Sequence, residues 1–412
     1  MTEAPRTARI LMVAPVPVFT PRGTPIAILN RCKALSVLGH RVDLITYPIG
    51  EDVPVPNLRY LRGPAIPGLT RVKVGPSLAK LPLNAGVLAT LLRHLRRGRY
   101  DVLHTHEEAG LFGAWLHRRA GIPHVHDLHN DLAMATENYG YSARHPFVRC
   151  ASWLEGRIIS TAATTIVIYP DLAALVHRHA PSTPVHVVHN VPFEPPADPP
   201  LVEELRRTWA PAGEPLVVYT GTLEPYQGID VLLKGFAATR PASDGPAPRL
   251  IVVGGRDAQI AELRPRAADL GVGDRVVFTG LRPPGEIPSC MAAADVLVSA
   301  RSTGSNIPLK IYSYLRAGKP IVATDIPSHT QVLDGTTAML VDYSPAALAA
   351  GLTKVLSDPA LRRELGAAAA RLAADRYSPP AYLREVAGCY ADVGFPAPDP
   401  PDLEAMAATL DR

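Results

Sequence analysis

Short apolar runs alternate with longer stretches of helical periodicity through the first half of the chain. The run Arg9 to Ala14 ends in a proline-rich loop, and the stretch Ile26 to Leu38 that follows predicts a helix that Gly39 ends. Further apolar runs predict the other strands of this half: Arg41–Thr46, Tyr100–His104, His124–Asp127, Thr165–Ile168 and Val185–Val188. Continuous β-branched runs separated by helices indicate a parallel sheet covered on both faces.

The same alternation starts again after a linker. Phe193 to Pro200 is rich in proline and acidic residues, which is typical of a segment between domains. A helix is predicted from Asp230 to Ala238, and the apolar runs around it predict strands: Pro215–Thr220, Arg249–Val253, Val276–Phe278, Val296–Ser299 and Ile321–Ala323. The fold class predicted is therefore α/β, with two Rossmann-like domains at residues 1–194 and 195–379 and a C-terminal helical segment, 380–412, that crosses back to the first domain. Since such sheets bind ligands beyond the carboxyl ends of their strands, we expect the ligand in a cleft between the domains.

Composition narrows the classes of function. The chain has 412 residues, 47% of them hydrophobic and 19% charged, as expected for a globular protein with a large core. A formal net charge of +4 implies no nucleic-acid-binding tail. The four cysteines are too widely spaced for a disulfide framework or a zinc site, and free cysteines fit a reducing cytoplasm. Residues 1–9 are too short for a signal peptide, and no apolar run reaches the length of a membrane span, so a cytoplasmic protein is expected.

The most informative segment is Ser302 to Thr324, STGSNIPLKIYSYLRAGKPIVAT. A Gly/Ser/Asn loop follows a predicted strand, and a helix opens near Ile307 and Pro308, where proline is favoured. The unpaired N–H groups at such a helix end attract anions, and Lys310 one turn later adds a positive charge. The segment therefore predicts a phosphate-binding site. The chain has no Gly-x-Gly-x-x-Gly loop after the first strand and no P-loop motif, which argues against an NAD-binding dehydrogenase.

In this segment and in several others the chain resembles the family 4 glycosyltransferases, and the resemblance covers nearly its whole length. The matching pieces are Gly23, Asp101–His106, Gly121–Pro123 leading to His129, Val188–Pro192, Tyr219–Gly221, Gly228–Leu233, Val252–Gly255, Val276–Gly280 and Ala294–Val296. The resemblance implies the GT-B fold, in which the two parallel sheets face an interdomain cleft. It also implies a hexosyltransferase that moves a sugar from a nucleotide-diphosphate donor with retention of configuration, without a metal ion or a cofactor. The bias toward Ala, Arg and Pro in the composition suggests a bacterial source.

The chain departs from the usual family pattern at four charged positions. The family motif has two glutamates, one for the donor sugar and one for the ribose, and here Ser305 and Ser313 stand in their places. An arginine and a lysine that usually hold the diphosphate are replaced by Thr222 and Gln227. The chain resembles a subgroup that has PLKIYSYL and EPYQG at these places. Lys310 is therefore expected to supply the missing positive charge, with loss of activity as the other interpretation.

The resemblance also implies a set of donor-binding residues. Gly280 and Leu281 are expected to border the base, and Ser305 and Asn306 to bond the sugar hydroxyls. The complete predicted donor set is Gly23, Thr222, Gln227, Gly228, Gly255, Gly280, Leu281, Ser305, Asn306, Ile307, Pro308, Lys310 and Ser313.

The catalytic and acceptor-binding residues are expected mainly in the first domain. His129 corresponds to a family histidine beside the donor sugar, and Glu107 is expected to contact an acceptor hydroxyl. The predicted catalytic set is His129, Lys310 and Glu107, and the predicted acceptor set is Arg22, Glu107 and Asn130. A metal site at His124, His126 and His129 is not expected, because only alternate residues of a strand share a face and no acidic partner is fixed.

Several alternatives stay open. The alternatives to a glycosyltransferase are a sugar-nucleotide-binding protein without catalysis and another GT-B enzyme, such as a nucleotide-sugar epimerase. A phosphorylase would need a cofactor lysine, and none is identifiable in the sequence. The acceptor is a saccharide, a lipid-linked molecule or a small natural product. Residues 70–100 combine an apolar stretch with seven basic residues, so this segment is either a core-facing helix or a peripheral contact with the inner face of a membrane.

Overall fold

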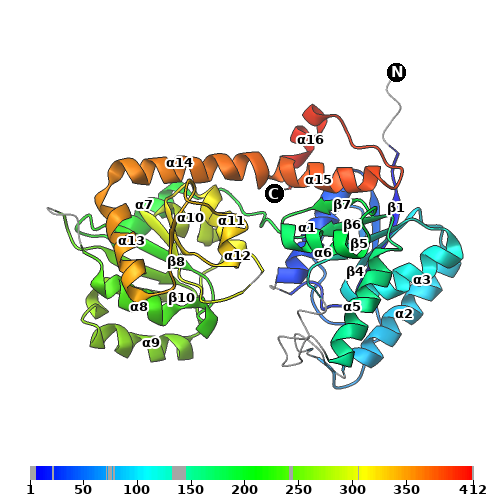
Figure 1. Ribbon diagram of the computed structural model, residues 1–412, viewed down its shortest axis with the longest axis horizontal. Helices are drawn as coiled ribbons and strands as arrows, with labels where there is room; N and C mark the ends of the chain where they lie inside the picture. The colour runs from blue at the N-terminus through cyan, green and yellow to red at the C-terminus, as the bar shows by residue number, and fades with distance from the viewer. Residues whose placement is uncertain are drawn as a thin grey trace. The chain divides into compact units, whose positions relative to one another are not determined.

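The computed structural model describes residues 6–20, 23–70, 72, 77, 79–131, 145–240, 245–304 and 306–410 (the side chain of Phe147 excepted). The chain forms two compact units, one of Met1–Phe193 with Pro379–Arg412 and one of Glu194–Ser378. Each unit contains one parallel sheet with helices packed against it (Figure 1). The result is an α/β protein of two Rossmann-like domains.

The first unit has a seven-stranded sheet in the order β3-β2-β1-β4-β5-β6-β7, with every pair parallel. Its strands are β1 (Arg9–Ala14), β2 (Arg41–Thr46), β3 (Leu58–Arg62), β4 (Val102–His106), β5 (His124–Leu128), β6 (Thr164–Val167) and β7 (Val185–Val187). Its helices are α1 (Gly23–Val37), α2 (Lys80–Arg97), α3 (Gly110–Ala120), α5 (Pro146–Ile159), α6 (Pro170–His179), α15 (Pro379–Ala391) and α16 (Pro400–Ala407).

Alternation along β1 separates two core layers in this unit. Ile10 and Met12 pack with residues of α1, α15 and α16, whereas Leu11 and Val13 pack with residues of α2 and α3. Since successive strand residues point to opposite faces, one apolar run supplies both layers. The sheet is therefore buried on both faces, as the continuous apolar runs predicted.

The second unit has a six-stranded parallel sheet in the order β10-β9-β8-β11-β12-β13. Its strands are β8 (Leu216–Thr220), β9 (Arg249–Val253), β10 (Val276–Gly280), β11 (Val296–Ser299), β12 (Ile321–Thr324) and β13 (Met339–Val341). Its helices are α7 (Pro199–Trp209), α8 (Ile229–Ala238), α9 (Asp257–Asp269), α10 (Ile287–Ala292), α11 (Leu309–Arg316), α12 (Pro327–Thr330), α13 (Pro345–Ser357) and α14 (Pro359–Arg376).

Some predicted boundaries were wrong. β4 runs two residues past His104, to His106. The last residues of the strand are polar but buried, so no apolar run marks where it ends. Helix α1 begins at Gly23 rather than Ile26, and α11 begins at Leu309 with Pro308 as its N-cap.

The basic segment 70–100 forms helix α2 over its second part. Leu83, Val87 and Leu91 of this helix are buried in the core beside the sheet. Because the apolar face of α2 already packs against protein, the core-facing interpretation fits this helix, and Arg71 and Lys73 lie outside the described residues. Among the described residues, no helix combines the length and the apolar character needed to cross a membrane.

Candidate functional site

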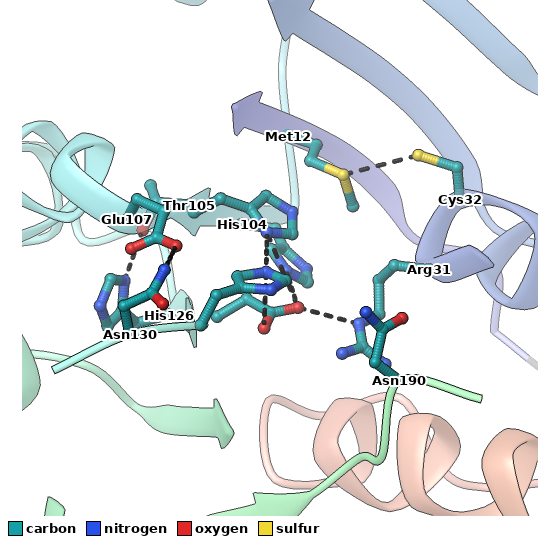
Figure 2. Close-up of polar contacts among 12 residues, drawn as sticks. Met12, Arg31, Cys32, His104, Thr105, Glu107, His126, Asn130 and Asn190 are labelled. Atoms are coloured by element: carbon teal, nitrogen blue, oxygen red, sulfur yellow. Dashed lines mark hydrogen bonds and ion pairs between the residues drawn. The ribbon is translucent and has the colours of Figure 1, made fainter. Parts of the chain in front are cut away.

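Strand alternation gathers polar side chains at the carboxyl ends of β4 and β5. His104 and His106 lie on the same face of β4, and Asp127 and His129 turn toward them from β5 and the residues after it. All four side chains are almost completely buried. Figure 2 shows His104 of this cluster, and Arg31 of α1 is directed toward the cluster, where it pairs with Asp127.

A buried ion pair is the centre of this cluster. Arg31 Nε donates to Asp127 Oδ2 at 2.9 Å, and both side chains are at most 1% exposed. Burial alone would raise the pKa of Asp127, but the charge of Arg31 outweighs burial and holds that pKa well below its usual value. Arg31 also donates to the hydroxyl of Tyr382 on α15 at 3.1 Å. Asp127 is therefore charged, and its charge is balanced within the first unit.

The three neighbouring histidines are neutral. Burial lowers the pKa of His104, His106 and His129, more than the charge of Asp127 raises it. The His104 ring nitrogen Nδ1 lies 2.8 Å from the Tyr390 hydroxyl, and His106 Nδ1 lies 3.1 Å from His129 Nε2. The second nitrogen of each of these three rings is buried without a hydrogen-bond partner among the described residues.

Three potential metal ligands lie close together here, but they are not the histidines of the sequence pattern His124, His126 and His129. Ligand atoms of His104, His106 and Asp127 lie within 4.8 Å of one another. The guanidinium of Arg31 already occupies one oxygen of Asp127, and its charge opposes a divalent cation at the same place. The arrangement therefore suits a neutral hydrogen-bonded cluster better than a metal site.

His124 and His126 point to the opposite face of β5. The hydroxyl oxygen of Thr105 lies 2.7 Å from His124 Nε2 and 3.2 Å from His126 Nδ1. Both rings pack against glycines of α3, Gly113 beside His124 and Gly110 beside His126. These two histidines are packing residues, and the structure does not bring them together with His129.

Glu107 and Asn130 follow the ends of β4 and β5. Asn130 Nδ2 donates to Glu107 Oε1 at 2.9 Å (Figure 2). Burial and the neighbouring charge of Glu108 raise the pKa of Glu107 to about 8. Glu107 has a φ of 50°, an unusual conformation for a residue other than glycine and one that is often found at functional sites.

The start of α1 is hydrogen-bonded to the segment that follows β7. Asn190 Nδ2 donates to the carbonyl oxygen of Gly23 at 3.3 Å, and a Cβ at Gly23 would meet no atom within 4 Å. Gly23 thus opens the helix, and its φ is not positive as a turn glycine's would be. Arg22 lies outside the described residues.

In the second unit the candidate donor residues gather where the strand order reverses. β8 pairs with β9 on one side and with β11 on the other, so the chain leaves the ends of β8 and β11 in opposite directions. Open parallel sheets bind ligands at this point. The loop after β8 carries Gln227, and the segment after β11 carries Lys310.

Lys310 and Gln227 meet there across 83 positions of sequence. Lys310 Nζ donates to Gln227 Oε1 at 3.0 Å and lies 3.9 Å from the centre of the Tyr219 ring. Burial and the nearby Arg301 lower the pKa of Lys310 well below its usual value. Lys310 forms no ion pair with a carboxylate of the described residues. An incoming anion would therefore stabilise its charged form.

Arg301 is a second cation in the same region. Its guanidinium Nε donates to the carbonyl oxygen of Thr303 at 2.7 Å, and its Cζ lies 5.3 Å from the centre of the Tyr226 ring. Burial lowers the pKa of Arg301, and no carboxylate of the described residues forms an ion pair with it. Arg301 was not among the residues predicted from the sequence.

Glycines bring the backbone close to these side chains. Gly228 has a φ of 70°, and a Cβ there would lie 1.9 Å from the carbonyl oxygen of Ala300. A Cβ at Gly255 would lie 2.2 Å from Leu223 Cδ1. Only glycine fits either position, so the loops after β8 and β9 can run close to a ligand.

The remaining predicted donor residues lie at the same ends of the strands. Thr222 is exposed and its carbonyl oxygen accepts from the Tyr219 hydroxyl at 2.6 Å. Leu281, after Gly280 at the end of β10, is 78% exposed. Asn306, Ile307 and Pro308 precede α11, Ser313 lies inside it, and Ser305 is outside the described residues.

Two family models match the chain in the order of its units. Residues 22–191 match one described as "Glycosyl transferase 4-like domain", and residues 214–358 match one described as "Glycosyl transferases group 1". A D-inositol 3-phosphate glycosyltransferase of Jonesia denitrificans is 30% identical over 292 residues, which cover 66% of this chain and 68% of that protein. A protein of the same name from Corynebacterium glutamicum is 28% identical, and the match covers 84% of this chain and 85% of that protein.

A solved structure has the same fold. The crystal structure of HepE from Anabaena in complex with UDP superposes with a TM-score of 0.70 at 19% identity and covers 93% of this chain and 99% of that one. The two parallel-sheet domains are thus those of the GT-B fold. From the two family matches and the Jonesia relative, the chain belongs to the group 1 glycosyltransferases, with a glycosyltransferase 4-like first domain.

Proposed function

We propose that this glycosyltransferase moves a hexosyl unit from a nucleotide-diphosphate sugar to a hydroxyl group, with retention of configuration and without a metal ion. The observation that carries the proposal is the position of Lys310. Its ammonium group lies at the topological switch point, held by Gln227 and the face of Tyr219, with no carboxylate of the described residues to pair it. A diphosphate would supply that missing counter-charge.

The chemistry proposed needs no protein nucleophile. The acceptor oxygen bonds to the anomeric carbon on the face from which the diphosphate leaves, and the bond from that carbon to the phosphate oxygen breaks. The proton of the acceptor hydroxyl passes to a phosphate oxygen. Lys310, Arg301 and the N–H groups that open α11 would stabilise the negative charge that develops on the leaving diphosphate.

In the first unit we assign the acceptor side to Glu107 and Asn130. A carboxyl group whose pKa is raised to about 8 keeps its proton at neutral pH, so Glu107 would both donate to and accept from an acceptor hydroxyl. His129, neutral and held by His106, would contribute to the sugar side together with Gly23, and Arg22 is assigned to the acceptor with Glu107 and Asn130.

The relatives indicate which substrates to test first. The names of the two relatives contain D-inositol 3-phosphate, which supports a polyol or saccharide hydroxyl as the acceptor class. HepE was crystallised with UDP, so a uridine donor is the first candidate.

A thermal-shift screen with UDP, GDP, ADP and CDP tests the donor site. At about 100 times its dissociation constant, a nucleotide that binds the folded chain should stabilise it by about 2.7 kcal/mol, or roughly 5 °C in melting temperature. Lys310→Ala should abolish this shift, and Lys234→Ala, an exposed lysine on α8, should preserve it. A full shift in the Lys310→Ala protein would reject the role of Lys310.

Turnover separates the remaining alternatives. A transferase consumes the donor faster when an acceptor hydroxyl is present, whereas an epimerase converts the donor without one, and a binding protein does neither. If the reaction is independent of metal, saturating EDTA should leave the rate of transfer to a panel of polyol acceptors unchanged.

A further inference from the structure

The hydroxyl of Tyr314 lies between two strands at the switch point of the second sheet. It accepts from the backbone N–H of Thr220, the last residue of β8, at 2.8 Å, and from the Thr220 hydroxyl at 3.3 Å. It donates to the carbonyl oxygen of Val298 on β11 at 3.3 Å. Burial raises the pKa of Tyr314 to about 12, so this hydroxyl keeps its proton at neutral pH. One donated and two accepted hydrogen bonds satisfy it completely.

These hydrogen bonds lie where β8 and β11 stop pairing. The register of the two strands ends with Leu297 opposite Val218, although β11 continues to Ser299 and β8 to Thr220. A hydroxyl that accepts from an N–H of one strand and donates to a carbonyl oxygen of the next takes the place of a direct backbone hydrogen bond between them. Because Tyr314 is fully buried, water does not compete for these groups. The Tyr314 hydroxyl therefore holds the two strand ends at a fixed spacing.

Lys310 shares both its helix and its contacts with this arrangement. Tyr314 follows Lys310 by one turn of α11, so the two side chains lie on the same face of the helix. The residues on either side of Thr220 lie against the lysine. Its Nζ is 3.9 Å from the centre of the Tyr219 ring, and a Cβ at Gly221 would be 3.4 Å from the same atom. Tyr314 thus links the helix that carries Lys310 to the strand end that Lys310 contacts.

A change in the spacing of the strand ends would move the surroundings of the ammonium group. Electrostatic stabilisation of an anion depends on groups that are already held in place, so such a movement would weaken it. On the basis of the proposed donor site, we propose that Tyr314 is a positioning residue for diphosphate binding. Its hydroxyl sets the spacing of β8 and β11 and so holds Lys310 where the phosphates bind, without itself touching the ligand.

Titration calorimetry on the full chain tests this role. The probes are inorganic pyrophosphate and the diphosphate that binds best among UDP, GDP, ADP and CDP. Tyr314→Phe keeps the ring but leaves the buried N–H of Thr220 without its partner. Both probes should bind about tenfold more weakly and by the same factor, since Lys310 acts on the phosphates that they share.

The titration also separates positioning from a merely structural role. If Tyr314 positions Lys310, the dissociation constant rises and the number of binding sites per chain stays at the wild-type value. If the hydroxyl only stabilises the fold, its loss unfolds a fraction of the protein. The number of sites then falls, and the dissociation constant of the folded fraction stays unchanged.

Tyr312→Phe is the matched control. Tyr312 is almost as buried on the same helix, but its ring packs against Tyr377, 5.0 Å away between ring centres. This variant should bind both probes as the wild-type protein does. Equal weakening by both substitutions overturns the positioning role, because the effect would then not belong to the Tyr314 hydroxyl.

A second variant covers the case in which Tyr314→Phe does not fold. Thr220→Val removes one of the three hydrogen bonds of the Tyr314 hydroxyl and should weaken pyrophosphate binding about threefold. An unchanged dissociation constant in Tyr314→Phe, or in Thr220→Val where that variant stands in for it, overturns the positioning role while the donor site stands. Failure of the wild-type protein to bind any of these probes overturns the proposed function itself.

Discussion

Two buried or half-buried cations of this molecule differ in what balances their charge. One is paired with a carboxylate of the chain, and the other is placed where a bound anion would pair with it. Arg31 lies in a helix whose other residues are mostly apolar and buried, and it balances Asp127, 96 positions away. Lys310 is half-buried and contacts an amide oxygen and an aromatic face instead. The contrast separates a structural ion pair in one unit from a candidate anion site in the other.

Substitution of Arg31 should show how much the stability of the first unit depends on the buried ion pair. Arg31→Met keeps the volume but leaves Asp127 charged and uncompensated, so we expect a loss of about 3–5 kcal/mol in the free energy of unfolding at pH 7. Urea denaturation measures this. Adding Asp127→Asn to Arg31→Met should recover most of the loss.

The loss should also depend on pH. In the variant the pKa of Asp127 rises because its main positive neighbour is gone. The folded variant then takes up a proton more readily than the wild-type protein as pH falls, so the deficit is largest at neutral pH and shrinks toward pH 4. A deficit that is independent of pH would show that lost packing, rather than the lone charge, destabilises the variant.

Whole strands and helices were largely predictable, because long apolar runs decide them. β1, β2, β9 and β11 have the predicted bounds. The edge strands β3 and β13 were missed, since their side chains are mostly half-buried and give no continuous apolar run. Tight contacts between elements, such as the glycines of α3 against β5, leave only a weak trace in the sequence.

A substitution that adds a methyl group to α3 should show how tightly this helix packs against β5. In Gly113→Ala the new Cβ would lie 2.2 Å from Nε2 of the buried His124, so either the helix or the ring must move. Overpacking of this kind costs about 1–3 kcal/mol. Thermal and urea unfolding should show this destabilisation, whereas Gly23→Ala, where the Cβ meets nothing within 4 Å, should be neutral or slightly stabilising. Equal stability of both variants would mean that α3 adjusts freely.

The candidate functional residues of the molecule are divided between its two units. Glu107, His129 and Asn130 belong to the first unit, and Gln227, Lys310 and Ser313 belong to the second. The sequence motifs indicated which strand ends carry these residues, because a parallel sheet places its carboxyl ends along one edge. The motifs could not indicate the partners, since Gln227 with Lys310 and Glu194 with Ser313 are contacts between distant segments.

This division predicts where a bound nucleotide should slow hydrogen exchange. With a saturating nucleoside diphosphate, the amides of residues 221–228, 301–304 and 306–308 should exchange more slowly, because they lie in the loops around Lys310 and most of them are partly exposed without a ligand. Residues 10–14 of the first sheet should change little, because they are already buried and hydrogen-bonded. Mass spectrometry of peptic fragments resolves these segments, and Lys310→Ala should remove the protection. Protection confined to Met1–Phe193 would place the diphosphate in the first unit and contradict the donor site argued from Lys310, because that lysine lies in Glu194–Ser378.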